Sequence, residues 1–392
     1  MNFDAQYLFR MPTRVIYGFN SIHLAAGEAI HYGAQKALAV TDQGLLEAGL
    51  LEPLLQALQS SGLKYEVFSD VPVDPDTQVV DRGTRFLKDT GCQAVIIVGG
   101  GSCLCAGKGM ALLATNGGNI RDYAGVEKYK HPPLPVIAIP TTAGSGSEVS
   151  AAFQISDESR EHSKVSINGW HVFPEVALLD PLLLRTLPPR QFVFSAADAL
   201  AHALETTCTE LTTPLTDAIA YEAIRLMMNN LAKAAFTDDL EAKGRQLLAS
   251  TMANIACGNS KLGLAHAVAS PLDTIFHLAH GQANGIMLPY AMEYTLPAAM
   301  DKLARLAIAC GLAQPWMSQP EQAGAALQGI KNLLASLDFP DRIPEDVVPK
   351  HEIPRMVRTV LNFPLPLIKF NLRKPTEADL TDIYEKAYTG WR

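Results

Sequence analysis

Apolar runs that alternate with helix-like stretches constrain the fold of the first 185 residues more than any other feature. The runs at 36–42, 65–69, 94–98 and 134–142 are separated by segments with helical periodicity, such as 45–60 and 79–90. They are apolar almost throughout rather than at alternate positions, which is typical of strands buried on both faces of a parallel sheet. We therefore expect an α/β domain of Rossmann-like type over residues 1–185, with ligands bound at the carboxyl ends of its strands.

The composition of the chain changes after Asp180-Pro181, where Leu, Ala and Met become dominant. Helical periodicity runs through 190–209, 214–233, 240–261 and 300–311, and strand-like runs disappear. Residues 186–392 should therefore form an all-α domain. Before this boundary, 153–155 and 164–167 predict a short hairpin.

Composition excludes several classes of protein. The 392 residues carry a formal charge of −8, without the basic face that a nucleic-acid binder needs. No apolar run reaches the ~18–20 residues of a membrane span, and the first ten residues do not resemble a signal peptide. Six scattered cysteines fit reduced thiols in a cytoplasmic protein. Cys103 and Cys105 follow a glycine turn, where a helix N-terminus could activate a thiol, although we favour packed, inert cysteines.

Four side chains form the main candidate site. Asp198 and His202 are four residues apart in S-A-A-D-A-L-A-H, which places both on one face of a helix. His266 lies in another apolar stretch, and His280 precedes Gly281 at an expected helix end. One carboxylate and three imidazoles suit a divalent transition metal such as Fe²⁺ or Zn²⁺, and a metal would satisfy polar groups that are costly to bury alone.

A second candidate site follows the third strand, at Gly99-Gly100-Gly101-Ser102. Glycines allow the backbone to approach a pyrophosphate, and Ser102 could cap the next helix. The pattern is not G-x-G-x-x-G, and any tight strand–helix turn could use it. Asp42, at the tip of the first strand, could accept from ribose hydroxyls and favour NAD over NADP, or simply cap a helix. The hydroxyls of 141–147 and the Lys164 ammonium could add cofactor contacts, although an isolated lysine is usually solvated.

With these motifs in view, the chain resembles the iron-dependent (group III) alcohol dehydrogenases, which include lactaldehyde reductase and 1,3-propanediol dehydrogenase. The likeness runs from Pro12 to the end and is most specific in D-A-L-A-H-A-L-E, G-L-A-H-A and A-H-G-Q-A-N-G-I-M-L-P. It implies a dehydroquinate synthase-like architecture, a cleft for cofactor and metal, and a homodimer or larger ring. It also implies two sets of residues: the metal ligands Asp198, His202, His266 and His280, and the NAD contacts Asp42, Gly99, Gly100, Gly101, Ser102, Thr141, Thr142, Ser145 and Lys164.

The chain departs from the family pattern close to these sites. Ser270 stands four residues after the third ligand, where the family usually has a histidine assigned to proton relay or substrate contact. Cys105 replaces the aspartate of G-G-G-S-x-x-D. His277 lies three residues before His280, so we expect it to help carry the proton that Ser270 cannot accept near neutral pH. Arg373 could border the cleft or be structural.

The sequence thus predicts an NAD(H)- and metal-dependent alcohol dehydrogenase or aldehyde reductase. It would move a hydride between nicotinamide and a small primary alcohol or aldehyde, with His277 and His280 in the catalytic site. Neither a nucleic acid nor a membrane is an expected partner. Two alternatives remain open at this point. One is a non-catalytic protein that binds NAD or a metal, and the other is a dehydroquinate synthase-like cyclase, which would need a Lys/Arg pocket for its phosphorylated substrate.

Overall fold

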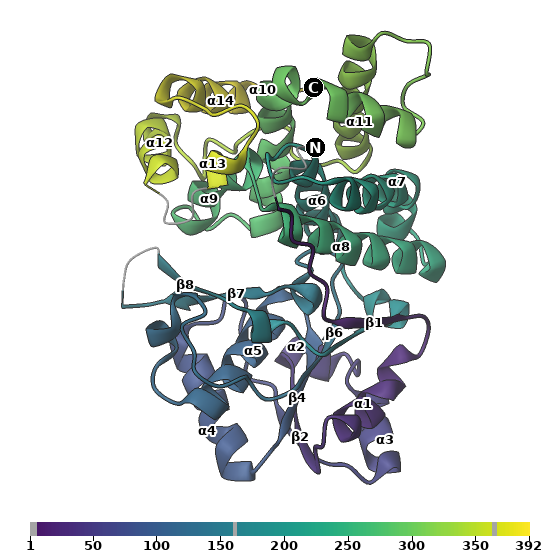
Figure 1. The fold of residues 1–392 in the computed structure, drawn as a ribbon, viewed down its shortest axis with the longest axis vertical. Coiled ribbons are helices and arrows are strands. Elements are labelled where there is room, and N and C mark those ends of the chain that lie inside the picture. The colour runs from purple at the N-terminus through teal and green to yellow at the C-terminus, as the bar shows by residue number, and fades with distance from the viewer. Residues whose placement is uncertain (1–5, 160–162, 363–366) are drawn as a thin grey trace. The chain divides into compact units, whose positions relative to one another are not determined.

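The computed structural model describes residues 6–159, 163–362 and 367–392 (Figure 1). The chain forms two compact units, Met11–Leu187 and Pro188–Arg392, the second of which also includes residues 6–10. Each unit has its own secondary structure and its own packed interior, and each is described separately below.

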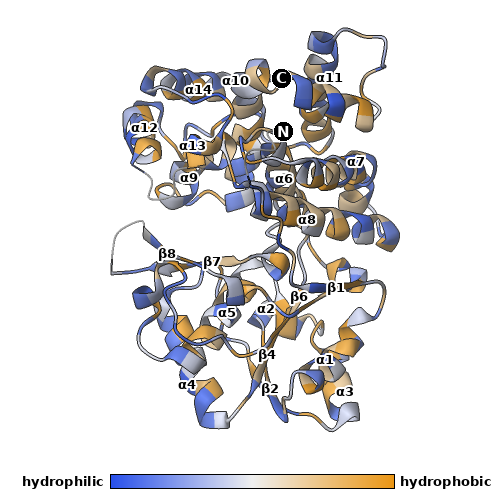
Figure 2. Cartoon of the chain, viewed as in Figure 1, coloured by the Kyte–Doolittle hydropathy of each residue, from blue (hydrophilic) through white to orange (hydrophobic). Residues whose placement is uncertain are grey.

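A six-stranded parallel sheet is the centre of the first unit. Its two middle strands, β6 and β4, are buried at every position, and Figure 2 shows the central strands as mostly hydrophobic. This confirms the expected parallel sheet, because strands covered on both faces have no solvent side on which to place polar residues. The order across the sheet is β1 (Arg14–Tyr17), β9 (Val176–Leu179), β6 (Val136–Pro140), β4 (Ala94–Gly99), β2 (Lys36–Val40) and β3 (Lys64–Phe68).

The sequence prediction missed β1 and β9. Both strands have only four residues, and β1 is an edge strand whose outer residues, Arg14 and Tyr17, are exposed. A run of four residues is too short to show a periodicity, whether it is partly exposed like β1 or fully buried like β9, so only pairing with the rest of the sheet makes these segments strands.

Helices cover the two faces of this sheet with separate apolar clusters. Helices α4 (Thr77–Thr90) and α5 (Gly101–Asn116) contribute to one cluster, and α1 (Ala25–His31) and α3 (Glu52–Ser61) to the other. The helix expected at 45–60 is in fact two, because α2 (Gln43–Glu47) ends before Gly49, whose φ of 71° is left-handed.

A second, three-stranded sheet lies beside α5 in the same unit. Its strands β7 (Ala152–Asp157) and β8 (Ser163–Asn168) pair antiparallel, which confirms the expected hairpin pairing, and β5 (Gly125–Val126) adds to β8 in parallel. The contact between α5 and β7 brings the 152–157 segment against the helix that follows the glycine turn.

The second unit is helical, as predicted. Its central helix α6 is buried almost throughout and packs against α7, α8 and α10. Helix α10 was predicted only at 300–311. It begins instead at His280, because Pro289 and Pro297 are accommodated inside it and a kink occurs at Ala299. The helices are α6 (Pro189–Thr207), α7 (Pro214–Phe236), α8 (Leu240–Ser260), α9 (Leu264–Thr274), α10 (His280–Ala309), α11 (Gln319–Ser336), α12 (Ile353–Leu361), α13 (Leu367–Phe370) and α14 (Glu377–Thr389).

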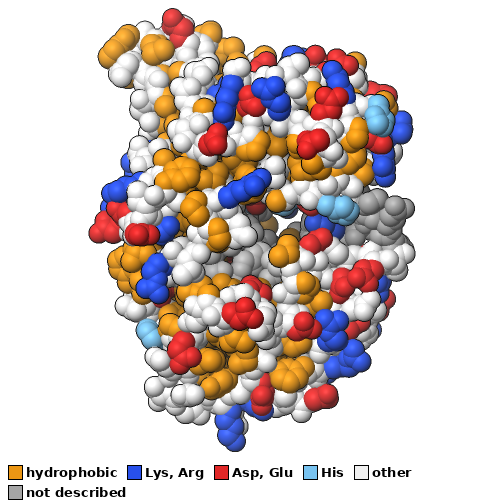
Figure 3. Space-filling view, turned by 180° about the vertical axis from the view of Figure 1, so that it is seen from behind, with side chains coloured by type: hydrophobic (Ala, Val, Ile, Leu, Met, Phe, Trp, Pro, Cys, Tyr) orange, Lys and Arg blue, Asp and Glu red, His pale blue; other side chains and the backbone are white. Residues whose placement is uncertain are grey.

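Among the described residues, no helix combines the length and apolarity that a bilayer span requires. Figure 3 shows acidic and basic side chains interspersed over the face it draws, in keeping with the mild formal charge of −8.

Candidate metal and cofactor sites

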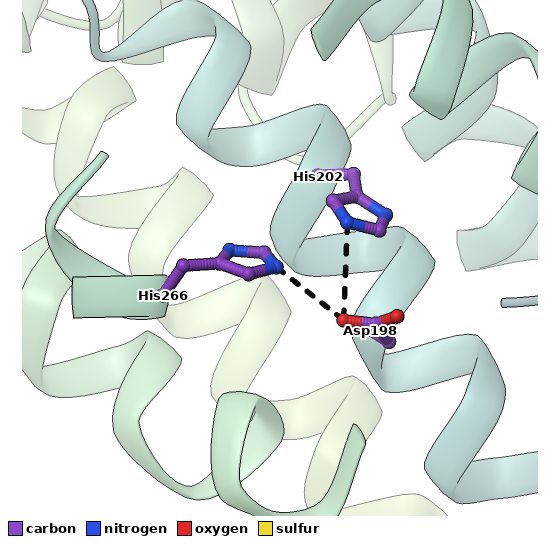
Figure 4. Close-up of side chains that lie close together, drawn as sticks. All are labelled: Asp198, His202 and His266. Carbon is purple, nitrogen blue, oxygen red and sulfur yellow. Dashed lines mark ion pairs between the residues drawn. The ribbon is translucent and has the colours of Figure 1, made fainter. Parts of the chain in front are cut away.

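Helix α6 supplies the first two candidate metal ligands. Asp198 and His202 lie one turn apart on the same face of this Ala- and Leu-rich helix, as their spacing predicts (Figure 4). Their side chains are only 7% and 8% exposed, and the His202 Nε2 atom lies 3.9 Å from Asp198 Oδ1. An acid and a histidine are therefore held in an apolar interior where neither can be solvated.

Helix α9 supplies His266, which faces the same aspartate (Figure 4). The His266 Nε2 atom lies 3.4 Å from Asp198 Oδ1, and its ring stacks on that of His202 with centroids 4.8 Å apart. On its other side, Nδ1 lies 2.6 Å from Glu205 Oε2. Glu205 therefore fixes the ring so that Nε2 points at Asp198, an arrangement typical of a histidine that ligates a metal.

Helix α10 supplies the fourth candidate, His280, as its first residue. The His280 Nε2 atom lies 3.6 Å from Asp198 Oδ1, and Nδ1 lies 2.9 Å from Asp273 Oδ2. We expected a helix to end near Gly281, and this was wrong, because a helix begins there. Unlike the other three, the His280 side chain is half exposed, at 53%.

The donor atoms are spaced as a metal site requires. Three imidazole Nε2 atoms lie 3.4, 3.6 and 3.9 Å from one oxygen, Asp198 Oδ1. Ligands about 2.1 Å from a tetrahedral ion would be about 3.4 Å apart. Asp198, His202 and His266 also offer one ligand atom each within 4.8 Å of one another.

Charge balance supports a cation at this point. Two buried carboxylates, Asp198 and Glu205, are ionised: burial alone would raise both pKa values, but the neighbouring imidazoles hold both below their usual range. Burial alone would lower the pKa of His266, yet Glu205 and Asp198 raise it to about 10. The two acids thus draw a positive charge into the interior, which a divalent cation could supply.

Hydrogen bonding also tests the fit of a metal. His266 Nε2 is buried, has no hydrogen-bond partner among the described residues and points at Asp198, so a cation there could take the place of its proton. Burial lowers the pKa of His202 to about 4, which keeps its ring neutral and able to ligate. Asn284 also enters the site, because its Nδ2 lies 2.7 Å from Asp198 Oδ1 and 3.1 Å from His280 Nε2. His280 must give up this amide contact in order to bind an ion.

The remaining candidates near this site are less central. His277 is exposed and lies in the linker between α9 and α10, with a left-handed φ of 57°. Ser270 lies on α9 directly before Pro271, and its carbonyl accepts from the Thr274 hydroxyl. The Arg373 guanidinium stacks 3.9 Å from the ring centre of Tyr294 and donates to the Tyr294 carbonyl. These contacts favour the structural interpretation of Arg373.

In the first unit, the three candidate phosphate-binding glycines are packed against neighbouring side chains. A Cβ on Gly99 would lie 2.4 Å from Cys103 Cβ, one on Gly100 3.2 Å from Thr142 Cγ2, and one on Gly101 3.1 Å from Ser145 Cβ. Packing by itself therefore requires small residues in this turn. The backbone of the turn lies at the start of α5. Cys103 beneath it is buried and its thiol pKa is raised by burial and by Asp42, so this cysteine is an inert packing residue.

Two of the candidate cofactor residues have structural partners. Asp42 caps α2 by accepting from the Leu45 N–H at 2.9 Å, and its other oxygen lies 3.5 Å from Cys103 Sγ. Ser102 does not cap α5, contrary to the prediction, since Gly100 is the N-cap residue. The Ser102 hydroxyl instead accepts from the Asp74 N–H at 3.2 Å, because α5 begins earlier than expected.

The other candidate cofactor residues lie near the same turn. Thr141 donates its N–H to the Gly99 carbonyl at 3.1 Å, so the 141–147 loop starts beside the glycines. Thr142 and Ser145 pack onto Gly100 and Gly101, as described above. Lys164 forms an ion pair with Asp74 at 3.5 Å. The pairing of β4 with β6 thus brings the 141–147 loop beside the glycine turn at the carboxyl ends of these strands, whereas Lys164 lies on β8 of the smaller sheet.

Sequence reasoning missed three residues of the metal site: Glu205, Asn284 and Asp273. Two of them carried a signal. Glu205 follows His202 by three residues and Asn284 follows His280 by four, so both share a helix face with a ligand. Asp273 carried none, because its approach to His280 depends on the turn between two helices.

Both halves of the chain match known proteins. The iron-containing alcohol dehydrogenase family model matches residues 12–181, and the model of the C-terminal part of the Fe-containing family matches residues 192–388. The 1,3-propanediol dehydrogenase of Citrobacter freundii is 32% identical over 383 residues, which cover 97% of this chain and 98% of that protein. The crystal structure of a 1,3-propanediol oxidoreductase covers 98% of this chain and 100% of its own, at 31% identity and a TM-score of 0.94. Sulfoacetaldehyde reductase from Bifidobacterium kashiwanohense, in complex with NAD+, covers 98% of this chain and 99% of its own, at 26% identity and a TM-score of 0.89.

Proposed function

Because the chain belongs to the iron-containing alcohol dehydrogenase family and is an oxidoreductase acting on the CH–OH group of alcohols, we propose which residues hold its cofactors. The helical unit 186–392 binds a divalent iron through four side chains, with zinc as the alternative ion. The α/β unit 1–185 binds NAD. The proposed metal ligands are Asp198, His202, His266 and His280.

The observation that carries this proposal is the convergence of three imidazole Nε2 atoms on Asp198 Oδ1, at 3.4 to 3.9 Å. Histidines that lie near one another by chance are not expected to point all three Nε2 atoms at the same oxygen, Asp198 Oδ1. The Glu205 carboxylate orients His266 from behind, and α6 places Asp198 and His202 one turn apart on one face. Three of the four donors are thereby positioned before any ion binds, so a cation can enter with little reorganisation.

The chemistry divides between the cofactors and the chain. When bound, iron supplies Lewis acidity toward a substrate oxygen, and NAD accepts or returns a hydride. The chain would provide orientation: backbone N–H groups at the start of α5 would hold the pyrophosphate, and Asp42 would accept from a ribose hydroxyl. Thr141, Thr142, Ser145 and Lys164 complete the cofactor contacts. A proton leaves through His277, since Ser270 cannot accept it near neutral pH.

The substrate we propose is a small primary alcohol or its aldehyde. The similarity to a 1,3-propanediol dehydrogenase and to a sulfoacetaldehyde reductase supports short, polar carbon chains, including ones with an anionic head. We also propose that the enzyme works in the cytoplasm as a homodimer or a larger homo-oligomer. Its six cysteines are all free thiols, which fits a reducing compartment.

The test combines metal content with turnover. The purified protein is stripped with a chelator, reconstituted with Fe²⁺ or Zn²⁺, and assayed for NADH oxidation against aldehydes of two to four carbons. We expect one ion per chain and turnover only after reconstitution, with both lost in His202→Ala. The exposed His351→Ala variant is the matched control. Full turnover in the stripped protein, or an unchanged ion content in His202→Ala, would reject the assignment.

A further inference from the structure

A carboxylate outside the four proposed ligands contacts one of them directly. Asp273 Oδ2 lies 2.9 Å from Nδ1 of His280. Asp273 is in the last turn of α9 and His280 is the first residue of α10, so the pair joins two helices across a short linker. The Asp273 side chain is mostly covered, at 17% exposed, whereas His280 is half exposed.

The local sequence around Asp273 is unfavourable by itself. An acidic side chain in the last turn of a helix faces the negative end of the helix dipole. Between the two residues, His277 adopts a left-handed φ of 57°, a conformation that side chains with a Cβ seldom adopt. Local costs of this kind persist where a functional arrangement requires them.

The contact selects one form of the His280 ring. When the neutral imidazole donates its Nδ1–H to the Asp273 carboxylate, the lone pair is on Nε2, the atom that lies 3.6 Å from Asp198 Oδ1. Glu205 does the same for His266, whose Nδ1 lies 2.6 Å from its Oε2. By contrast, His202 Nδ1 has no hydrogen-bond partner among the described residues, and its ring rests on the stacked ring of His266.

We propose that Asp273 is a positioning residue that holds His280 as the fourth metal donor, by keeping its proton on Nδ1 and its ring turned toward Asp198. This inference rests on the metal site proposed above. The two carboxylate–histidine pairs have different tasks. The Glu205–His266 pair is buried, whereas His280 is on the exposed side of the site, so the contact with Asp273 limits how fast the ion leaves.

The experiment measures metal release from the full-length protein. Each variant is loaded with Co²⁺, and transfer of the ion to an excess of chelator is followed by visible absorption. We expect Asp273→Ala to release Co²⁺ about 10- to 100-fold faster than the native protein. Asp273→Asn keeps the shape and a neutral acceptor, so its release rate should lie between the two. Glu293→Gln removes a charge from α10 far from any ligand and is the matched control.

Histidine tautomers provide a second readout that a merely structural role would not change. In the zinc form with ¹⁵N-labelled histidine, His280 should carry its proton on Nδ1 in the native protein, with a perturbed Nδ1 resonance in Asp273→Ala. The proposal for Asp273 fails if both Asp273 variants release Co²⁺ within about twofold of the native rate while His280→Ala accelerates release. If His280→Ala and His202→Ala both bind Co²⁺ as tightly as the native protein, the proposed metal site itself is wrong.

Discussion

Glu205 and His266 are joined twice. One carboxylate oxygen of Glu205 accepts from the backbone N–H of His266 at 3.0 Å, and the other lies 2.6 Å from Nδ1 of the same residue. The first contact fixes where α9 begins relative to α6, and the second fixes the orientation and tautomer of the ring. One buried side chain therefore determines both the backbone and the ligand geometry of the third metal donor.

Replacing Glu205 by glutamine should weaken metal binding while the protein stays folded. The amide can still accept from the His266 N–H, but an NH₂ group facing Nδ1 favours the tautomer with its proton on Nε2, the atom that must bind the ion. We expect the affinity for Zn²⁺ to fall about 10- to 100-fold in a competition titration. Glu241→Gln, on the exposed face of α8, is the control, and equal affinities of the two variants would contradict this role of Glu205.

Gly281 should tolerate no side chain, because of the helix against which it packs. A Cβ there would lie 2.1 Å from the backbone carbonyl oxygen of Phe194 on α6, and a backbone cannot move as a flexible side chain can. We expect Gly281→Ala to cost about 1–3 kcal/mol of unfolding free energy and to weaken metal binding, because the neighbouring His280 is displaced.

Gly258 on α8 offers the matched control for that substitution. A Cβ at this position would meet nothing within 4 Å. Gly258→Ala should therefore stabilise the helix by about 0.5–1 kcal/mol and leave metal binding unchanged. Urea unfolding of both variants measures the difference, and a Gly281→Ala protein as stable as native would show that α6 and α10 can separate freely.

Lys108 should make the stability of the α/β unit depend on pH. Burial lowers the pKa of this lysine from its ordinary value of 10.5 to about 8, and its ammonium donates to the hydroxyl of Ser147 and to the carbonyls of Ser150 and Ala152. Between pH 8 and 10.5 the folded chain binds fewer protons here than the unfolded chain does. The contribution of Lys108 to the unfolding free energy should therefore rise with pH across this window, by about 3 kcal/mol in total, whereas the buried thiol of Cys103, whose pKa is raised, acts in the opposite direction.

The measurement follows Trp170, which lies in this unit, with the other two tryptophans replaced (Trp316→Phe, Trp391→Phe). Lys108→Met should flatten the rise of the unfolding free energy, because it removes the buried charge. Lys88→Met, on the exposed side of α4, controls for loss of a surface lysine. A rise of equal steepness in Lys108→Met would mean that another group titrates.

His277→Gln should lower turnover by about 100-fold and flatten its pH profile, if this side chain carries the proton. His277→Asn separates proton transfer from backbone strain, because asparagine adopts the left-handed conformation of this position more readily. The pH profile of turnover should be flattened to the same extent in both variants. A pH profile identical to the native one in either variant would remove His277 from the proton path.

Much of the fold was predictable because it depends on local pattern. The unbroken apolar runs at 94–98 and 136–139 predict the buried strands of a parallel sheet. The periodicity of the second half predicts its helices. The family resemblance, which rested on D-A-L-A-H-A-L-E and two later motifs, is confirmed by matches over both halves of the chain. Local pattern failed where tertiary packing overrides it, as at the edge strand β1 and in α10 with its two internal prolines.

The sequence by itself determined that Asp198 and His202 share one face of a helix, because residues four apart lie about one helical turn from each other wherever the helix lies. Only the tertiary structure decided which nitrogen of His266 faces Asp198, since that follows from a hydrogen bond to a residue 61 positions away. It also decided that Asp273 approaches His280 and that Ser102 bonds Asp74 rather than capping its helix. Spacing fixes neighbours along one element, whereas contacts between elements depend on how whole faces pack, which no short motif encodes.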